Sequence, residues 1–214
     1  MYKMNYKKFW KRLIELFGSL VLLVILSPIL LTAAILIRCK MGSPIFFKQD
    51  RLGLNGKIFK IWKFRSMTNC RDENGEFKAD EFRLTRFGKL LRDWSIDELP
   101  QLWNVVIGDM SLIGPRPFVA EYASRYTSEQ MRRHELRPGI SGWAQITGRN
   151  SLSWNQKFTL DVWYVDHCSL MLDLKILFST IPIVLNRVGV TAENHASMPE
   201  WTGNEAADKS SPSE

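Results

Sequence analysis

The chain has 214 residues, of which 45% are apolar and 24% charged, and this globular composition excludes collagen-like, fibrous and wholly disordered classes. Its 29 Lys and Arg residues outnumber 22 Asp and Glu residues, and the net charge of +7 favours polyanionic partners such as anionic lipid, nucleotide phosphates or nucleic acid. The three cysteines are far apart without a CxxC pair, so we expect no disulfide framework and favour a reducing, cytosol-facing compartment.

An apolar segment follows the basic N-terminus. The 22 residues from Leu16 to Ile37 carry no charge, and as a helix they would be roughly 33 Å long, about enough to cross a bilayer. Basic residues flank both ends, and Ser27-Pro28 lies in the middle, where proline removes a backbone hydrogen bond. These two features favour a bent helix that enters and leaves the membrane by one face. A spanning helix with a tolerated proline kink is the open alternative.

The rest of the chain shows extended and then helical patterns. Asn55-Gly56 between apolar runs predicts a β-hairpin over 45–67, and the polar stretch 69–82 predicts a surface loop. Helical spacing or composition is found over 84–94, 99–106, 128–136, 154–167 and 170–187. The last of these could be a core helix or could lie in the membrane interface, because its uncharged stretch is too short to span.

Two further segments have no helical pattern. The glycine-rich segment 139–150 predicts loop and short strand rather than regular helix. From residue 191 onward the chain is acidic, and residues 204–214 are small and polar, a composition typical of disorder.

A pair of neighbouring carboxylates, Asp97 and Glu98, is the first candidate for chemistry. Adjacent carboxylates can hold a divalent cation or divide the roles of nucleophile and base. Ser95 and Glu98 also have the spacing of a helix-capping box, which is the commoner use of such a sequence. Pro100 is tolerated only in the first helical turn, so it moves the helix start to Asp97 or later. The residues alone leave capping and chemistry both open.

Two other segments carry candidate phosphate-binding groups. Arg116 lies between Pro115 and Pro117, which restrict the backbone and suit its side chain to a bidentate phosphate contact. A rigid turn with a structural ion pair is the alternative for this arginine. In the glycine-rich segment, backbone amides, Gln145 and Arg149 could meet a phosphate or a base. Each of these signals is weak alone.

In this order, however, the segments resemble the bacterial sugar transferases, the monotopic phosphoglycosyl transferases. The resemblance runs from about Lys8 to Gly189 and rests on the Ser-Pro membrane segment, KxxKFRSM, DELPQLWNV, GDMSLIGPRP and RPGISGWAQITGRN. We expect a compact, mostly helical α/β domain with interfacial amphipathic helices and an N-terminal re-entrant membrane helix. The implied parts are a basic N-terminus with a re-entrant helix hairpin bent at Ser27 and Pro28 (1–40), a cytosolic catalytic domain (41–190) and an acidic tail (191–214).

The resemblance also implies a reaction. A sugar 1-phosphate, with an N-acetylated amino sugar expected, would pass from a UDP-sugar to undecaprenyl phosphate by a ping-pong mechanism that releases UMP. It implies Asp97 as the nucleophile and Mg²⁺ ligand, forming a covalent phosphosugar intermediate, and Glu98 as the base or a residue of the metal shell. The expected substrate-binding residues are Lys63, Arg92, Arg116, Gln145 and Arg149.

The expected location is the cytosolic face of the bacterial inner membrane, with no nucleic-acid partner and with a homodimer left open. A non-catalytic membrane scaffold that binds anionic lipid and a partner protein is the rival from another class, and it would tolerate Asp97→Asn. A nucleic-acid binder would show a steep salt dependence of binding. The apolar segment gives that second rival no support.

Overall fold

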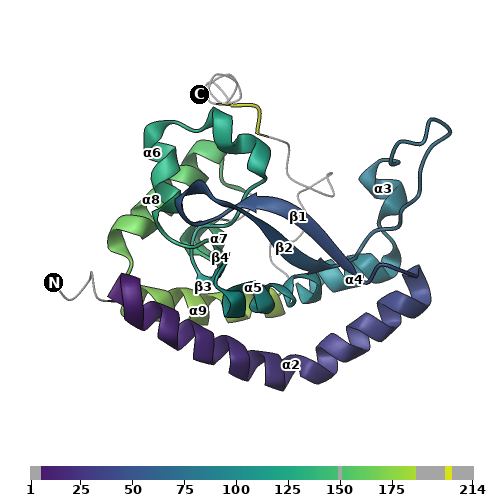
Figure 1. Cartoon of the computed structure of the whole chain (residues 1–214), viewed down its shortest axis with the longest axis horizontal. Coiled ribbons are helices and arrows are strands. Elements are labelled where there is room, and N and C mark those ends of the chain that lie inside the picture. The colour runs from purple at the N-terminus through teal and green to yellow at the C-terminus, as the bar shows by residue number, and fades with distance from the viewer. Residues whose placement is uncertain (1–5, 149–150, 187–200, 204–214) are drawn as a thin grey trace.

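The computed structural model describes residues 6–148, 151–186 and 201–203 (Figure 1). Its helices are α2 (Lys11–Met41), α3 (Asp80–Arg83), α4 (Arg86–Asp93), α5 (Gln101–Ile107), α6 (Ser128–Met131), α7 (Trp143–Thr147), α8 (Trp154–His167) and α9 (Leu170–Leu185). The strands are β1 (Phe46–Leu52), β2 (Ile58–Phe64), β3 (Ser111–Ile113) and β4 (Gly139–Ser141). Short helical turns are η1 (Tyr6–Trp10), η2 (Leu54–Gly56), η3 (Ile96–Glu98), η4 (Ala120–Arg125) and η5 (Arg132–Glu135). The architecture is therefore mostly helical with two small sheets, as expected.

Helix α2 runs without interruption from Lys11 to Met41 and bends near its middle (Figure 1). Pro28 cannot donate to the carbonyl of Val24, four residues earlier, and the Ser27 hydroxyl donates to that carbonyl instead at 2.7 Å. The Ser-Pro pair thus bends the helix without leaving this acceptor unpaired. The helix is long and apolar enough to cross a membrane, and only 11% of its most apolar 18-residue window is buried.

Both ends of α2 pack on the same globular body. Near the start of the helix, the Lys11 ammonium lies 2.6 Å from the Asp173 carboxylate of α9. Near its end, Ile37 is fully buried in a cluster with Phe64 of β2 and Leu91 of α4. The apolar middle of the helix lies between these two anchored ends.

The predicted hairpin over 45–67 is confirmed. Strands β1 and β2 pair antiparallel from Phe46 opposite Phe64 to Leu52 opposite Ile58. Asn55 and Gly56 adopt φ angles of 55° and 72° in the connection, a conformation that these two residue types tolerate best. One face of the hairpin packs on α5 and its flanking loop through a buried core cluster of Phe59, Ile61, Val105 and Met110.

Two predictions differ from the structure. The helix expected over 128–136 is divided into α6 and the tighter turn η5. The prediction of no regular helix in 139–150 is wrong, because α7 forms there. Its interior Trp-Ala-Gln-Ile-Thr contains no glycine, and Gly142 and Gly148 are its flanking residues. The short strand predicted in the same segment is confirmed as β4, but its parallel pairing with β3 was not predicted, since each strand has only three residues. The acidic tail lies outside the described residues except Trp201–Gly203.

Candidate active site

The two carboxylates lie in η3, the short turn that connects α4 to α5. Ser95 precedes this turn with a left-handed φ of 54°, so the chain reverses sharply after α4. The capping explanation is wrong here, because no side chain caps η3 and the first residue of α5 follows Pro100. The later helix start that Pro100 requires is confirmed. The side chains of Asp97 and Glu98 therefore do not cap helix α5.

Glu98 is held between two cations. Its Oε1 atom accepts hydrogen bonds from Lys63 Nζ at 2.7 Å and from Arg116 Nη2 at 2.8 Å. Burial raises the pKa of Glu98, but the charges of Arg116 and Lys63 outweigh it and hold the pKa well below its usual range. Lys63 comes from β2 and Arg116 from the loop after β3, so the fold brings together residues far apart in sequence. The structural ion pair that was the alternative interpretation for Arg116 is therefore present, and its partner is Glu98 of the dyad.

Asp97 has a different environment from its neighbour. Asp97 is 8% exposed, and its carboxylate has no hydrogen bond or ion pair within the described part of the chain. Burial and the charge of Glu98 raise the pKa of Asp97 to about 6, against the opposing influence of Lys63, Arg92 and Arg116. At neutral pH this carboxylate is ionised but poorly solvated, which suits a nucleophile or a metal ligand.

Arg92 approaches the dyad from α4. Its Nε donates to the Ser66 hydroxyl at 2.9 Å, and its charge lowers the pKa of Asp97. The helix can pack this close because of Gly88, where a Cβ atom would lie only 1.8 Å from the carbonyl oxygen of Ser66. Thr85 begins the helix by accepting a hydrogen bond from the Gly88 amide at 2.9 Å.

The backbone carbonyl of Arg116 is held by the buried ion pair between Arg133 and Asp161. Arg133 Nη2 lies 2.6 Å from both the carbonyl oxygen of Arg116 and Asp161 Oδ2. Arg133 is 1% exposed, and its guanidinium lies over the ring of Phe118 at 4.4 Å. Our sequence reasoning missed both charged residues. One signal was available for Asp161, because it lies between the apolar Phe158 and Val162 on the buried face of α8.

For the remaining two predicted residues, the described part of the chain gives no contact with the dyad. Gln145 lies on α7, where its amide nitrogen donates to the Ile140 carbonyl at 2.9 Å and its buried Oε1 has no partner among the described residues. Arg149 lies outside the described residues. Five of the seven predicted residues, Lys63, Arg92, Asp97, Glu98 and Arg116, therefore form one site.

The structure offers a limited set of metal ligands. Within residues 6–148, 151–186 and 201–203, no group of three or more His, Cys, Asp or Glu side chains could hold a metal ion. Mg²⁺ is commonly bound by one or two carboxylates together with water and substrate phosphates. The unpaired Asp97 carboxylate fits that arrangement.

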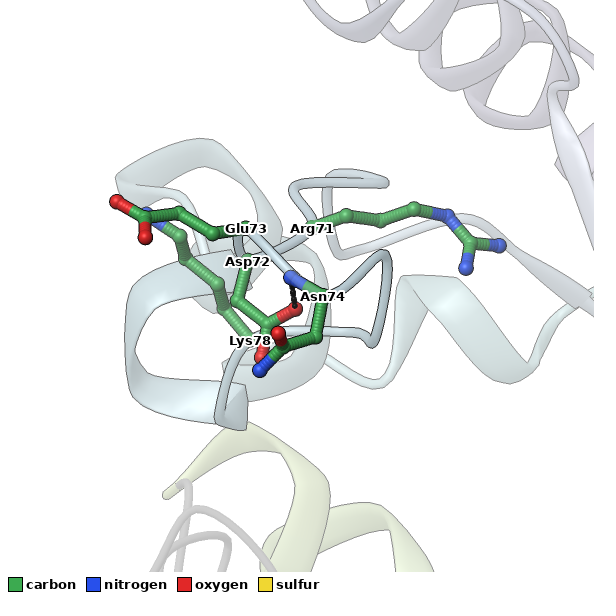
Figure 2. Close-up of a pocket in the computed structure, with 5 residues that line it drawn as sticks. All are labelled: Arg71, Asp72, Glu73, Asn74 and Lys78. Atoms are coloured by element: carbon green, nitrogen blue, oxygen red, sulfur yellow. Dashed lines mark hydrogen bonds between the residues drawn. The ribbon is translucent and has the colours of Figure 1, made fainter.

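A separate surface hollow in the loop before α3 is lined by Arg71, Asp72, Glu73, Asn74 and Lys78 (Figure 2). Asp72 Oδ1 accepts hydrogen bonds at 2.9 Å from the backbone amides of Asn74 and Glu76. Figure 2 shows the Arg71 side chain extending away from this carboxylate. These bonds stabilise a turn, and they do not gather groups for chemistry.

Asp97 is buried and Glu98 partly buried, and the charges of Lys63, Arg92 and Arg116 act on this acidic pair. The chain belongs to the bacterial sugar transferase family, whose sequence profile matches residues 6–187. The protein is accordingly a transferase, as the sequence motifs imply.

Three relatives illustrate this membership. The chain is 53% identical over 193 residues to an uncharacterized sugar transferase, EpsL, of Bacillus subtilis, which covers 90% of this chain and 96% of the relative. It is 39% identical to the UDP-glucose:undecaprenyl-phosphate glucose-1-phosphate transferase of Klebsiella pneumoniae, over 80% of this chain and 39% of that protein. It is also 39% identical to the UDP-N-acetylgalactosamine-undecaprenyl-phosphate N-acetylgalactosaminephosphotransferase of Aeromonas hydrophila, over 85% of this chain and 45% of that protein. The chain thus spans less than half the length of the last two.

Proposed function

We propose that this protein transfers a sugar 1-phosphate from a UDP-sugar to undecaprenyl phosphate and releases UMP. The observation that carries the proposal is the contrast within the dyad, where Glu98 pairs with Lys63 and Arg116 and Asp97 is unpaired among the described residues. The names of the Klebsiella and Aeromonas relatives describe transfer between these two kinds of substrate, which supports the same reaction here.

The proposed mechanism has two displacements at one phosphorus atom. An Asp97 carboxylate oxygen attacks the β-phosphorus of the UDP-sugar, the bond to the bridging oxygen breaks, and UMP leaves with that electron pair. The sugar phosphate then stays on Asp97 as an acyl phosphate. An oxygen of undecaprenyl phosphate attacks the same phosphorus, and the carboxylate of Asp97 is regenerated. Glu98 keeps Lys63 and Arg116 in place during both steps.

The surrounding cations offset charge repulsion. A diphosphate and a carboxylate repel each other, and fixed positive groups in a poorly solvated site reduce that cost. Arg92 and Arg116 present guanidinium groups suited to bidentate contacts with phosphate, and Lys63 supplies a further charge. We also propose Gln145 and Arg149 as substrate contacts, on the family resemblance alone.

We further propose Mg²⁺ as the cofactor, held by the Asp97 carboxylate with Glu98 beside it. When bound, the ion would neutralise part of the diphosphate charge. The fit rests on a ligand set of one or two carboxylates, which is what Mg²⁺ needs when phosphates and water complete its shell. For the donor we propose an N-acetylated amino sugar, as in compact members of the family.

Helix α2 is proposed to be re-entrant in the inner membrane, with the catalytic domain on the cytosolic face. If the helix spanned the bilayer, its two ends would lie on opposite sides, yet Lys11 and Ile37 both contact the same body. Helix α9 presents a second exposed apolar surface, with Met171 77% and Phe178 64% exposed, which suits an interfacial position.

This topology can be tested with single cysteines. In a background without Cys70, the exposed Cys39 marks the end of α2, and Phe9→Cys in a background without Cys39 and Cys70 would mark its start. A membrane-impermeant maleimide should label both positions from the same side of inverted vesicles. Labelling from opposite sides would overturn the re-entrant helix in favour of a spanning one.

The reaction is tested by UMP release from a panel of UDP-sugars with Mg²⁺ and undecaprenyl phosphate, using the full chain in detergent. We expect release with one preferred donor that carries an N-acetylated amino sugar. Preference for UDP-glucose or UDP-galactose would refute the donor assignment only. No release with any donor would refute the reaction and favour the scaffold.

A further inference from the structure

Arg51 of β1 is a cation beside the site to which the proposed mechanism gives no role. Its Nη1 lies 3.4 Å from the carbonyl oxygen of Pro117, the residue after Arg116, and its Nη2 donates to Gln49 Oε1 at 2.6 Å. Strand and loop also meet here through the backbone, since the Leu52 amide donates to the Phe118 carbonyl at 3.2 Å. Arg51 therefore lies directly against the loop that carries Arg116.

This arginine has hydrogen-bonding capacity that the described residues do not use. A guanidinium carries five N–H donors, and the two contacts above engage two of them, one at the long distance of 3.4 Å. Its Nε is buried and has no partner among the described residues. Arg51 also makes no ion pair within that part of the chain, as is true of Arg92.

The charges around Arg51 also favour the binding of an anion next to it. Burial and the positive charge of Arg116 lower the pKa of Arg51 to about 10, so the two guanidinium groups repel each other across the loop. Arg116 is neutralised by Glu98, whereas the Glu98 and Glu121 carboxylates influence Arg51 without contacting it. Two neighbouring arginines with one carboxylate in contact leave a positive charge that a bound phosphate would compensate.

We infer that Arg51 binds the phosphate that remains on the uridine nucleotide, next to the phosphate that Arg116 holds. This inference rests on the proposed function, because it assumes a UDP-sugar whose β-phosphate is attacked by Asp97. When the bond to the bridging oxygen breaks, negative charge gathers on the departing UMP. The Arg51 guanidinium lies against the loop that carries Arg116, and there it would stabilise that charge.

The rival explanation is that Arg51 only supports the loop through Pro117. The two roles are separated by binding UMP and uridine, which differ only in the phosphate. We would measure both dissociation constants by calorimetry on the full chain in detergent with Mg²⁺, for wild type, Arg51→Met and Arg51→Lys. The matched control is Arg83→Met, because Arg83 also donates to a backbone carbonyl, that of Thr68 at 3.1 Å, but it is the last residue of α3 and pairs with Asp80 rather than with the Arg116 loop.

We expect Arg51→Met to weaken UMP binding about tenfold or more while uridine binding changes less than about twofold, as loss of a charge-assisted hydrogen bond predicts. Arg51→Lys should lose less, and Arg83→Met should keep the wild-type ratio of the two constants. An unchanged ratio in both Arg51 variants would overturn the inference and leave the proposed function intact. A wild-type protein that neither binds UMP nor releases it from any donor would overturn both.

Discussion

The guanidinium of Arg133 donates to the backbone carbonyl of Arg116 at 2.6 Å, so a fully buried arginine fixes the peptide of the arginine that pairs with Glu98. Arg133 is held in turn by Asp161 on α8, through Nε and Nη2 at 3.1 and 2.6 Å. The position of the Arg116 side chain thus depends on a helix that itself contributes no residue to the dyad.

Arg133→Met should destabilise the protein by about 3–5 kcal/mol, because it leaves the Asp161 carboxylate buried without its partner. Combining it with Asp161→Leu should recover much of this loss, since an apolar pair can replace a buried ion pair. Turnover should stay low in the double variant, because the Arg116 carbonyl still lacks its donor. Denaturant unfolding and UMP release measure the two effects, and full turnover in the double variant would show that Arg133 has only a structural role.

Asp97→Asn should lower the rate of UMP release by about 10³-fold or more, because an amide cannot act as the nucleophile. The same change should stabilise the fold. The pKa of Asp97 is about 6 in the folded protein and 3.8 ordinarily, so its ionisation costs stability as the pH rises between these values. At pH 7.5 we expect a gain of about 3 kcal/mol, which should largely disappear near pH 4.

Asp93→Asn is the matched control for that variant. Asp93 lies four residues earlier, paired with Lys89 at 2.9 Å on the surface of α4, where a salt bridge contributes little. Thermal unfolding should place its stability within about 0.5 kcal/mol of wild type. Equal stabilisation by both variants, or wild-type turnover in Asp97→Asn, would contradict the assignment of Asp97.

The pH dependence of the first displacement should follow the same group. Attack requires the ionised carboxylate, so the burst of UMP in a rapid-quench experiment without lipid acceptor should decline as the pH falls through about 6. Glu98 should remain ionised through this range, because Arg116 and Lys63 hold its pKa below the usual value. A burst that is constant from pH 8 to pH 5 would exclude Asp97 as the titrating nucleophile.

Local sequence signals predicted the elements whose formation depends on residues close together in the chain. Asn55-Gly56 predicted the hairpin because these residues tolerate positive φ, and Ser153 with Gln156 caps α8 at the predicted start. The β3–β4 pair could not be predicted, since it depends on a close approach between distant segments. A Cβ on Gly139 would lie 2.1 Å from the Gly114 amide nitrogen, which no local pattern reveals.

The same division applies to the site. Motifs and family resemblance identified the dyad and Arg116, but Arg51 and Arg133 were missed because their importance comes from contacts across the fold. Arg51 lies 66 residues from Pro117, and Arg133 lies 17 residues from Arg116 and 28 from Asp161. A buried charge becomes recognisable only when the surface that buries it is known.

The attachment of α2 supplies the last prediction. Lys11 is 5% exposed, and its Nζ lies 2.8 Å from Glu15 and 2.6 Å from Asp173, whose carboxylate also accepts from the Tyr6 hydroxyl at 2.6 Å. Lys11→Met would leave two buried carboxylates without a cation and should cost about 3–5 kcal/mol of unfolding free energy in detergent. It should also release the start of the helix to proteolysis. Lys89→Met removes an exposed lysine with the same i,i+4 spacing to its partner and should cost less than about 1 kcal/mol. Equal costs for the two variants would show that the buried cluster does not anchor the membrane helix.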